Sequence, residues 1–169
     1  MDKQRVSANY LIENLELIKH PEGGYFKEVY RSNENLSHLP KRFSGERSTA
    51  TSIYFLLNEK DKSHLHKIRS DETWHFYLGS SAIIHMINEN GEYSKVVVGS
   101  NLSEGEVFQF TIPYGVWFAA ELVNKSSFGL FGCTVAPGFD FQDFELAKAS
   151  DLVSLCPSEK DLIQDFCLS

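Results

Sequence analysis

The sequence has few of the features that mark a secreted or membrane protein. It contains three cysteines, Cys133, Cys156 and Cys167, an odd number with no C-x-x-C spacing, which argues against a disulfide framework. No window approaches the ~18 consecutive apolar residues of a membrane span. The first ten residues contain no apolar run of the kind found in secretory signals. We therefore expect a cytoplasmic protein with reduced thiols and no membrane partner.

Clustered positive charge is also scarce. The chain has 16 Lys and Arg against 23 Asp and Glu, a net charge of −7, and Lys41–Arg42 is its only adjacent basic pair. Binding to a phosphate backbone needs clustered Lys and Arg, so nucleic acid is excluded as the main partner.

The bulk composition is that of an ordinary globular protein. Hydrophobic residues make up 42% of the 169 residues, and thirteen are Phe, which is enough for a sizeable core in one domain. We find no internal repeat, low-complexity tract or linker. The sequence therefore predicts a single domain over residues 1–169.

Most of the chain has the pattern of short strands. They recur about every ten residues with turn residues between them, which is typical of an antiparallel sandwich or barrel. Asn90-Gly91 predicts a type I′ hairpin. The strand-like segments are 25–30, 48–57, 73–79, 81–87, 93–99, 107–112, 116–123 and 128–135.

Helices are expected only near the two ends. Residues 7–19 have helical spacing after a possible Ser7 cap, and Ser158 is placed to cap the segment 160–166. The polar stretch 33–46 is a long loop that suggests a lid or a partner contact. The phenylalanines of 139–147 alternate with acidic residues and are expected to cover an edge of the barrel.

Residues 63–79 contain the clearest candidate site. His64 and His66 are two apart, so on a regular strand both imidazoles face the same side, and Glu72 follows after a short turn. These three groups could hold a divalent metal or act as acid and base on a substrate. In a structural interpretation, the two histidines only make local hydrogen bonds.

Other pocket candidates lie on neighbouring strands. His75 has the opposite parity to Glu72, so both cannot face inward on a regular strand, and Tyr77 shares the face of His75. Trp117 and Glu121 share one face of the segment 116–123, where they could stack on a ring and accept hydrogen bonds from hydroxyls. The alternatives are core packing for Trp117 and, for Glu121, an ion pair with Arg47 or Arg31.

The motif residues resemble those of a known superfamily. H-x-H followed by E-x6-G, at His64, His66, Glu72 and Gly79, is similar to the first cupin motif. Gly105 followed by Pro113-x-Gly115 is similar to the start of the second motif. The blocks HPEGGYFKEVYRS, RSTATSIYFLL, PYGVWFAAE and CTVAPGFDFQDFE look like the signature of one cupin branch, described as a cupin-like domain of unknown function.

This resemblance implies an all-β jelly-roll barrel, with a core of about residues 20–145, short N- and C-terminal helices and motif residues at its mouth. It also implies a homodimer. Phe118 stands where metal-binding cupins place a fourth ligand, a His, and Phe cannot ligate. In that case Phe118 and Trp117 would supply apolar surface to an organic ligand.

Three hypotheses for function follow. In the first, the barrel pocket binds a small polar ligand, such as a sugar or nucleotide-sugar-like compound, without a tightly held metal. As an enzyme it would be an isomerase or epimerase, with His64 or His66 as base, Tyr77 as acid and Glu72 orienting the histidine. The second is a metalloenzyme with Fe, Mn, Ni or Zn on His64, His66 and Glu72. The third is a non-catalytic binding domain.

Overall fold

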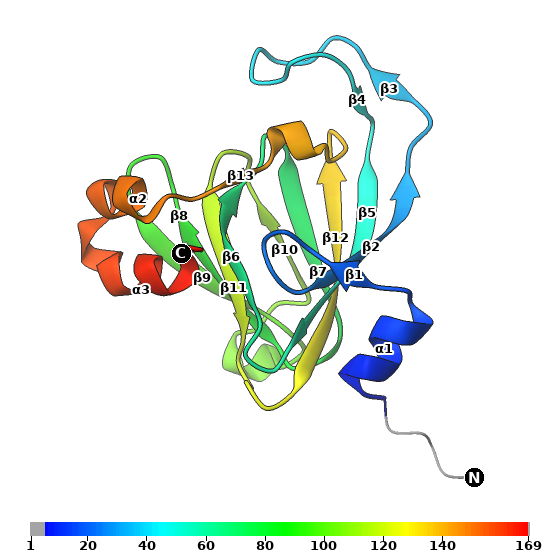
Figure 1. Ribbon diagram of the computed structural model, residues 1–169, viewed down its shortest axis with the longest axis vertical. Coiled ribbons are helices and arrows are strands. Elements are labelled where there is room, and N and C mark those ends of the chain that lie inside the picture. Colours follow the sequence, from blue (N-terminus) through cyan, green and yellow to red (C-terminus); the bar gives the residue numbers. More distant parts are fainter. Residues whose placement is uncertain (1–5, 169) are drawn as a thin grey trace.

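The computed structural model describes residues 6–168, and two antiparallel β-sheets dominate the chain (Figure 1). The first sheet has the order β1-β2-β5-β12-β7-β10, made of β1 (Ile18–Lys19), β2 (Tyr25–Arg31), β5 (Thr51–Asn58), β12 (Phe128–Ala136), β7 (Asp71–Gly79) and β10 (Gln109–Ile112). The second has the order β13-β6-β11-β8-β9, made of β13 (Glu145–Leu146), β6 (Lys62–Lys67), β11 (Trp117–Leu122), β8 (Ala82–Ile87) and β9 (Tyr93–Val98).

The two sheets enclose the main hydrophobic core, as sequence patterning predicts. On β7, Trp74 and Phe76 pack into this core, while Thr73 and His75 bond to threonines of the neighbouring strands on the outer face. This alternation is the two-residue period of a half-buried strand. The predicted all-β cupin jelly roll with short terminal helices is confirmed.

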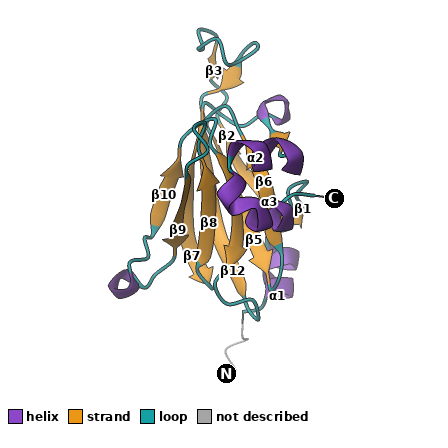
Figure 2. Cartoon of the chain, turned by 90° about the vertical axis from the view of Figure 1, so that its left-hand side faces the viewer, coloured by secondary structure: helices purple, strands orange, loops and turns teal. Residues whose placement is uncertain are grey.

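The helices lie outside the barrel. They are α1 (Ala8–Asn14), α2 (Ala149–Leu155) and α3 (Lys160–Phe166), with short 3-10 turns η1 (Leu102–Glu104), η2 (Phe141–Asp143) and η3 (Pro157–Glu159). Figure 2 shows α2 and α3 side by side against the second sheet, where they bury a second apolar cluster. No helix within residues 6–168 is long and apolar enough to cross a membrane.

The helix caps agree with the sequence at one end only. Ser7 caps α1 by accepting a hydrogen bond from the Tyr10 N–H at 3.2 Å. The predicted C-terminal helix is present as α3, but Ser158 lies inside η3 and does not cap it. The helix α2 was not predicted, because its sequence ASDLVSL has no capping side chain before it.

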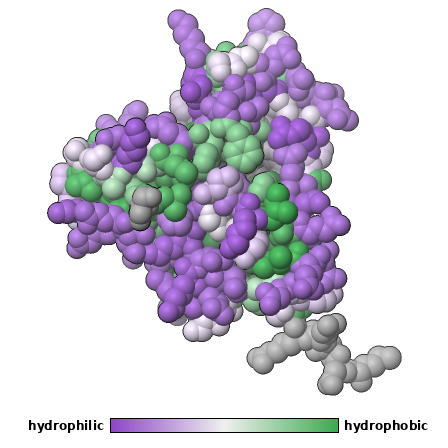
Figure 3. Space-filling model, in the orientation of Figure 1, coloured by the Kyte–Doolittle hydropathy of each residue, from purple (hydrophilic) through white to green (hydrophobic). Residues whose placement is uncertain are grey.

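Two connections differ from their prediction in detail. Strands β8 and β9 pair as a hairpin around Asn90-Gly91, but only Gly91 has a positive φ, so the turn is not type I′, which needs two such residues. The stretch 33–46 is not wholly a loop. It belongs to a projecting hairpin, β3 (Asn35–Leu36) paired with β4 (Arg47–Ser48), whose surface is largely hydrophilic (Figure 3).

Candidate functional site

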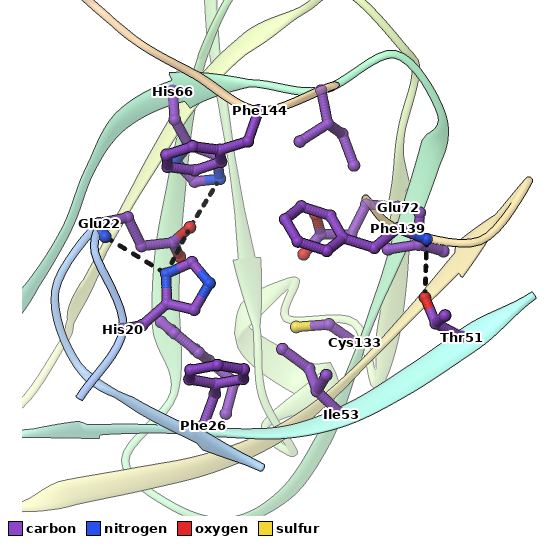
Figure 4. Close-up of a pocket in the computed structure, with 13 residues that line it drawn as sticks. His20, Glu22, Phe26, Thr51, Ile53, His66, Glu72, Cys133, Phe139 and Phe144 are labelled. Atoms are coloured by element: carbon purple, nitrogen blue, oxygen red, sulfur yellow. Dashed lines mark hydrogen bonds and ion pairs between the residues drawn. The ribbon is translucent and has the colours of Figure 1, made fainter. Parts of the chain in front are cut away.

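A cavity of about 40 Å³ lies between the two sheets, near the end of the barrel where β12 ends. Figure 4 shows histidine and carboxylate side chains on one wall and a second carboxyl and a thiol on the other. The lining residues are His20, Glu22, Phe26, Thr51, Ile53, Phe55, His66, Ile68, Glu72, Cys133, Val135, Phe139 and Phe144.

A tight turn at residues 20–24 brings Glu22 into this cavity. The Gly23 N–H donates to the His20 carbonyl at 3.0 Å, and the His64 N–H donates to the Glu22 carbonyl at 2.8 Å, which fixes the turn against β6. Gly23 has φ +108°, and a Cβ there would lie 2.1 Å from the Lys62 carbonyl oxygen. Only glycine fits this approach, so the Gly-Gly pair is what allows Glu22 to be buried here.

A β-bulge on β6 separates the two histidines of the H-x-H motif. Phe118 pairs with His66, but Ala120 pairs with Ser63, so β6 holds one extra residue. The bulge breaks the two-residue alternation, and Ser63 and His66 both reach Glu22. His64 instead donates from Nδ1 to the Glu22 carbonyl at 2.6 Å and does not line the cavity. The expectation that His64 shares the face of His66 is therefore wrong.

The hydrogen bonds fix where the protons of this cluster lie. His66 Nδ1 lies 2.7 Å from the His64 carbonyl and must donate to it, so Nε2 of the neutral ring carries no hydrogen and can only accept. His20 Nδ1 accepts a hydrogen bond from the Glu22 N–H at 3.2 Å, so it carries no hydrogen either. Glu22 Oε2 lies 3.2 Å from His66 Nε2 and 3.3 Å from His20 Nδ1. A proton must therefore lie between Glu22 Oε2 and one of these two ring nitrogens, because neither the carboxylate oxygen nor the nitrogens otherwise carry a hydrogen.

Burial explains why that proton stays on the carboxyl group. Burial raises the pKa of Glu22 well above its usual range, and the nearby Glu72 charge adds to this, while the hydrogen bond from Ser63 opposes it. Burial also lowers the pKa of His66, and it lowers that of His20 to about 4. At neutral pH the cluster is a carboxylic acid facing two neutral imidazoles. His20 Nε2 then carries a hydrogen and faces the cavity (Figure 4).

Glu72 forms the opposite wall of the cavity. Its burial raises its pKa to about 7, although the Cys133 thiol and the Trp74 indole partly offset this. Trp74 Nε1 is nevertheless buried without an acceptor at hydrogen-bonding distance among the described residues. Burial, with the charge of Glu72 adding to it, also holds the pKa of Cys133 well above its usual range, so this thiol stays protonated.

Aromatic residues from the segment after β12 cover the cavity. Phe144 lies 5.4 Å from the His66 ring and 5.9 Å from the His20 ring, measured between centroids. Phe139 lines the same cavity, and its N–H donates to Thr51 Oγ1 at 2.9 Å. The prediction that the phenylalanines of 139–147 cover the barrel is confirmed for these two. The segment is not one strand, however, because residues 141–143 form the 3-10 turn η2 and only Glu145–Leu146 form a strand, β13, and Phe141 is exposed.

Four other candidates lie away from the cavity. His75 and Tyr77 are on the outer face of the first sheet, where Tyr77 is 48% exposed and lies over Gly132. Trp117 packs in the cluster beneath the C-terminal helices. Glu121 pairs with Lys125 Nζ at 2.6 Å, not with Arg47 or Arg31. The expectation that these four line the pocket is therefore wrong.

The remaining candidate, Phe118, does face inward. It is 1% exposed and its ring centroid lies 4.0 Å from that of His66. Phe118 supports the imidazole from the core side and does not line the cavity. It stands where a metal-binding cupin would place a ligating His, so its contact with His66 is apolar packing.

The donor set proposed for a metal does not fit one. His64 does not line the cavity, and Glu72 faces His66 from the opposite wall (Figure 4), so the three side chains do not converge on one point. Among residues 6–168, no group of three or more His, Cys, Asp or Glu side chains has the arrangement of a metal centre. We therefore derive no catalytic step through a metal.

Sequence reasoning missed His20 and Glu22. Both residues lie in the block HPEGGYFKEVYRS, for which the family resemblance alone implies no role in a site. The available signal was a carboxylate directly before a glycine pair, because a turn tight enough to need two glycines can press its neighbour into a core.

The two facing antiparallel sheets, with carboxyl and imidazole groups in the cavity between them, are the architecture of a cupin-fold protein. The chain belongs to the family described as "Cupin superfamily (DUF985)", whose model matches residues 9–147. The resemblance inferred from the motifs is therefore confirmed.

Relatives of similar length support this assignment. A hypothetical protein from Leishmania major is 32% identical with a TM-score of 0.89, over 97% of this chain and 100% of that one. Protein SO0799 from Shewanella oneidensis is 37% identical with a TM-score of 0.86, over 96% and 98%. The uncharacterized protein YML079W of Saccharomyces cerevisiae is 32% identical over 86% of this chain and 77% of its own.

A more distant likeness concerns the fold alone. Oxalate decarboxylase from Bacillus subtilis is 17% identical with a TM-score of 0.54, over 88% of this chain and 36% of that one. It shows that the barrel is shared with cupin enzymes, and fold alone does not determine chemistry.

Proposed function

We propose that this protein is an isomerase or epimerase that moves a proton next to a carbonyl group of a small polar, sugar-like molecule. The observation that carries the proposal is a cavity with a protonated carboxyl–imidazole pair, Glu22 and His66, on one wall and a carboxyl of pKa about 7, Glu72, on the other. Two titratable groups with different protonation states facing one cavity are the mark of an acid and a base.

In the proposed reaction, the Glu72 carboxylate removes the proton from a carbon next to the carbonyl. The electron pair of that C–H bond forms the C=C bond of an enolate, and the His20 Nε2–H donates a hydrogen bond to the oxygen that gains charge. The proton held by Glu22 and His66 then adds to the same carbon from the other wall, which inverts its configuration. Exchange with solvent returns each group to its starting state.

Every role assigned from the sequence changes in this proposal, since the base is Glu72 rather than His64 or His66. Tyr77 cannot act as the acid because it lies on the outer face of β7, and its place is taken by the Glu22–His66 pair. Glu72 acts as a base rather than as a group that orients a histidine. The cavity of about 40 Å³ has room for only two or three waters, so the reacting carbonyl enters it and the rest of the ligand lies outside or displaces Phe144.

The proposal is tested by hydrogen exchange in D₂O. We expect the protein to catalyse the exchange of a single C–H next to a carbonyl in at least one member of a panel of sugars, sugar phosphates and hydroxy-keto acids, followed by proton NMR. This readout detects proton abstraction even where product does not accumulate. Exchange at the rate of buffer alone throughout the panel, with ligand binding detected for some members, would leave only the non-catalytic binding function.

The rate of this exchange is expected to depend on pH through Glu72. Because burial raises the pKa of Glu72 to about 7, the base is protonated and inactive at low pH. We expect kcat/KM at pH 5 to be about 100-fold below its value at pH 8, since the ionised fraction falls tenfold per pH unit below the pKa. A profile flat between pH 5 and 8 would contradict Glu72 as the base.

The expected homodimer stays a prediction. The first sheet exposes Tyr77 on β7 and Val29 and Tyr30 on β2, and exposed apolar side chains gathered on one face often mark interfaces. Light scattering on the purified protein would decide whether its mass is 19.2 kDa or twice that.

A further inference from the structure

A second hollow of about 300 Å³ adjoins the cavity, and Ile68 and Phe144 line both. Its other walls include Arg42, from the segment before β4, and Arg69, directly after β6. The proposed reaction leaves this hollow unused, although a ligand larger than the small cavity has room to extend past Phe144 into it.

Two arginines that line this hollow are each bound to the backbone of the other. Arg42 Nε donates to the Arg69 carbonyl at 2.8 Å, and Arg69 Nη1 donates to the Arg42 carbonyl at 2.9 Å. The Arg42 guanidinium also lies 3.8 Å from the centroid of the Tyr114 ring. These reciprocal bonds to carbonyls hold two like charges together, yet they leave both terminal nitrogens of Arg42 and Nη2 of Arg69 without an acceptor among the described residues.

The nearby carboxylates are already committed to other cations. The buried Arg47 donates to both carboxylate oxygens of Asp143 at 2.7 Å. Arg69 Nε lies farther from Asp143, at 3.8 Å from Oδ1. Glu145 pairs with Lys67 at 3.2 Å. The hollow therefore has an excess of positive charge, in a chain whose net charge is −7.

Two guanidinium groups with free donors in one hollow are suited to one class of ligand. Arginine presents paired N–H donors that match a carboxylate or phosphate, and two arginines can bind one such group together. We propose that Arg42 and Arg69 bind an anionic group, a phosphate or carboxylate, on the ligand whose carbonyl end enters the cavity. The ligand would then be an anionic hydroxy-carbonyl compound, a refinement that rests on the proposed function.

The subsite is tested without knowledge of that ligand. Inorganic phosphate and acetate are titrated separately into the ¹⁵N-labelled full chain at constant ionic strength, held with chloride, and the amide shifts are followed. We expect saturable shifts at residues 42, 69 and 114. Arg42→Gln and Arg69→Gln should each raise the dissociation constant at least about tenfold, which is the loss of affinity expected for one charge-assisted hydrogen bond. Whether phosphate or acetate binds more tightly distinguishes the two anions.

The control is Lys95→Gln, which removes the same charge from an exposed position on β9 and should change binding less than twofold. Arg42→Lys keeps the charge but loses the paired donors, so it should also weaken binding if geometry matters. No saturable shift in the wild type, or equal weakening by Lys95→Gln, would overturn the subsite. Glu72→Gln should leave anion binding unchanged, so a failed subsite and a failed catalytic proposal give different results.

Discussion

Glu72→Gln is expected to lower the rate of proton exchange by about 10²- to 10⁴-fold, the usual contribution of a positioned general base. The substitution keeps the shape of the side chain and removes its basicity, so ligand binding should persist while turnover falls. Glu22→Gln should lower the inversion of configuration at the reacting carbon by a similar factor, because an amide cannot return a proton from the other wall, while exchange through Glu72 alone persists. The measurement is exchange in D₂O for any substrate found in the panel.

A matched control is Glu121→Gln, which changes the same side chain on the outer side of β11, where Glu121 pairs with Lys125. We expect it to keep the wild-type rate within about twofold. If Glu72→Gln retained full activity while Glu121→Gln lost it, the base would have been assigned to the wrong carboxylate.

Glu72→Gln, which is expected to lower activity, should raise the stability of the fold at high pH. Because the folded pKa of Glu72 is raised to about 7 from an ordinary 4.5, folding favours the protonated form. The stability that this confers is complete below about pH 4.5 and is lost as pH rises through 7. At pH 8 the Gln variant should therefore be more stable than the wild type, by up to about 3 kcal/mol. Chemical denaturation at pH 5 and pH 8 measures this difference.

Arg47→Ala is expected to destabilise the fold by about 3–5 kcal/mol, the cost of leaving one partner of a buried ion pair alone. Arg47 and Asp143 are 3% and 5% exposed, and they form two hydrogen bonds of 2.7 Å. The pair joins β4 to η2, the segment that precedes Phe144, so its loss should also loosen the cover of the cavity. Urea denaturation of the variant measures the free energy of unfolding.

The comparison for this prediction is Lys27→Ala, which breaks an exposed pair with Glu16 and should destabilise the fold far less than Arg47→Ala, because solvent screens an exposed pair. Replacing both Arg47 and Asp143 with Met and Leu should recover part of the stability, because no unpaired charge stays buried. A loss below about 1 kcal/mol for Arg47→Ala would show that Arg69 takes over the contact with Asp143.

The sequence predicted the barrel better than the site. Strand spacing and the cupin motifs were sufficient for the fold, because the alternation of apolar residues reflects the two faces of each sheet. The parity argument on β7 also held, since Glu72 faces in while His75 and Tyr77 face out. Parity failed on β6, where the bulge between Ser63 and His66 adds a residue that no side-chain pattern reveals.

The positions of His20 and Glu22 in the site could not be predicted from the sequence for a different reason. His20 and Glu22 are about forty residues before His66 in the sequence, and only the packing of their turn on β6 brings them together. Long-range contacts of this kind depend on tertiary structure rather than on local periodicity. The H-x-H motif pointed to the correct strand, while the chemical partner of His66 came from a loop.

Carboxyl carbon NMR tests the central claim most directly, namely that one carboxyl in the cavity is protonated and the other titrates near neutrality. The protein is labelled with ¹³C at glutamate side chains and titrated from pH 4 to pH 9, with Glu22→Gln and Glu72→Gln used to assign the two signals. We predict a midpoint of about 7 for Glu72 and a Glu22 signal that stays protonated at neutral pH. If both carboxyls titrate below pH 5, as exposed glutamates do, the acid–base site proposed here does not exist.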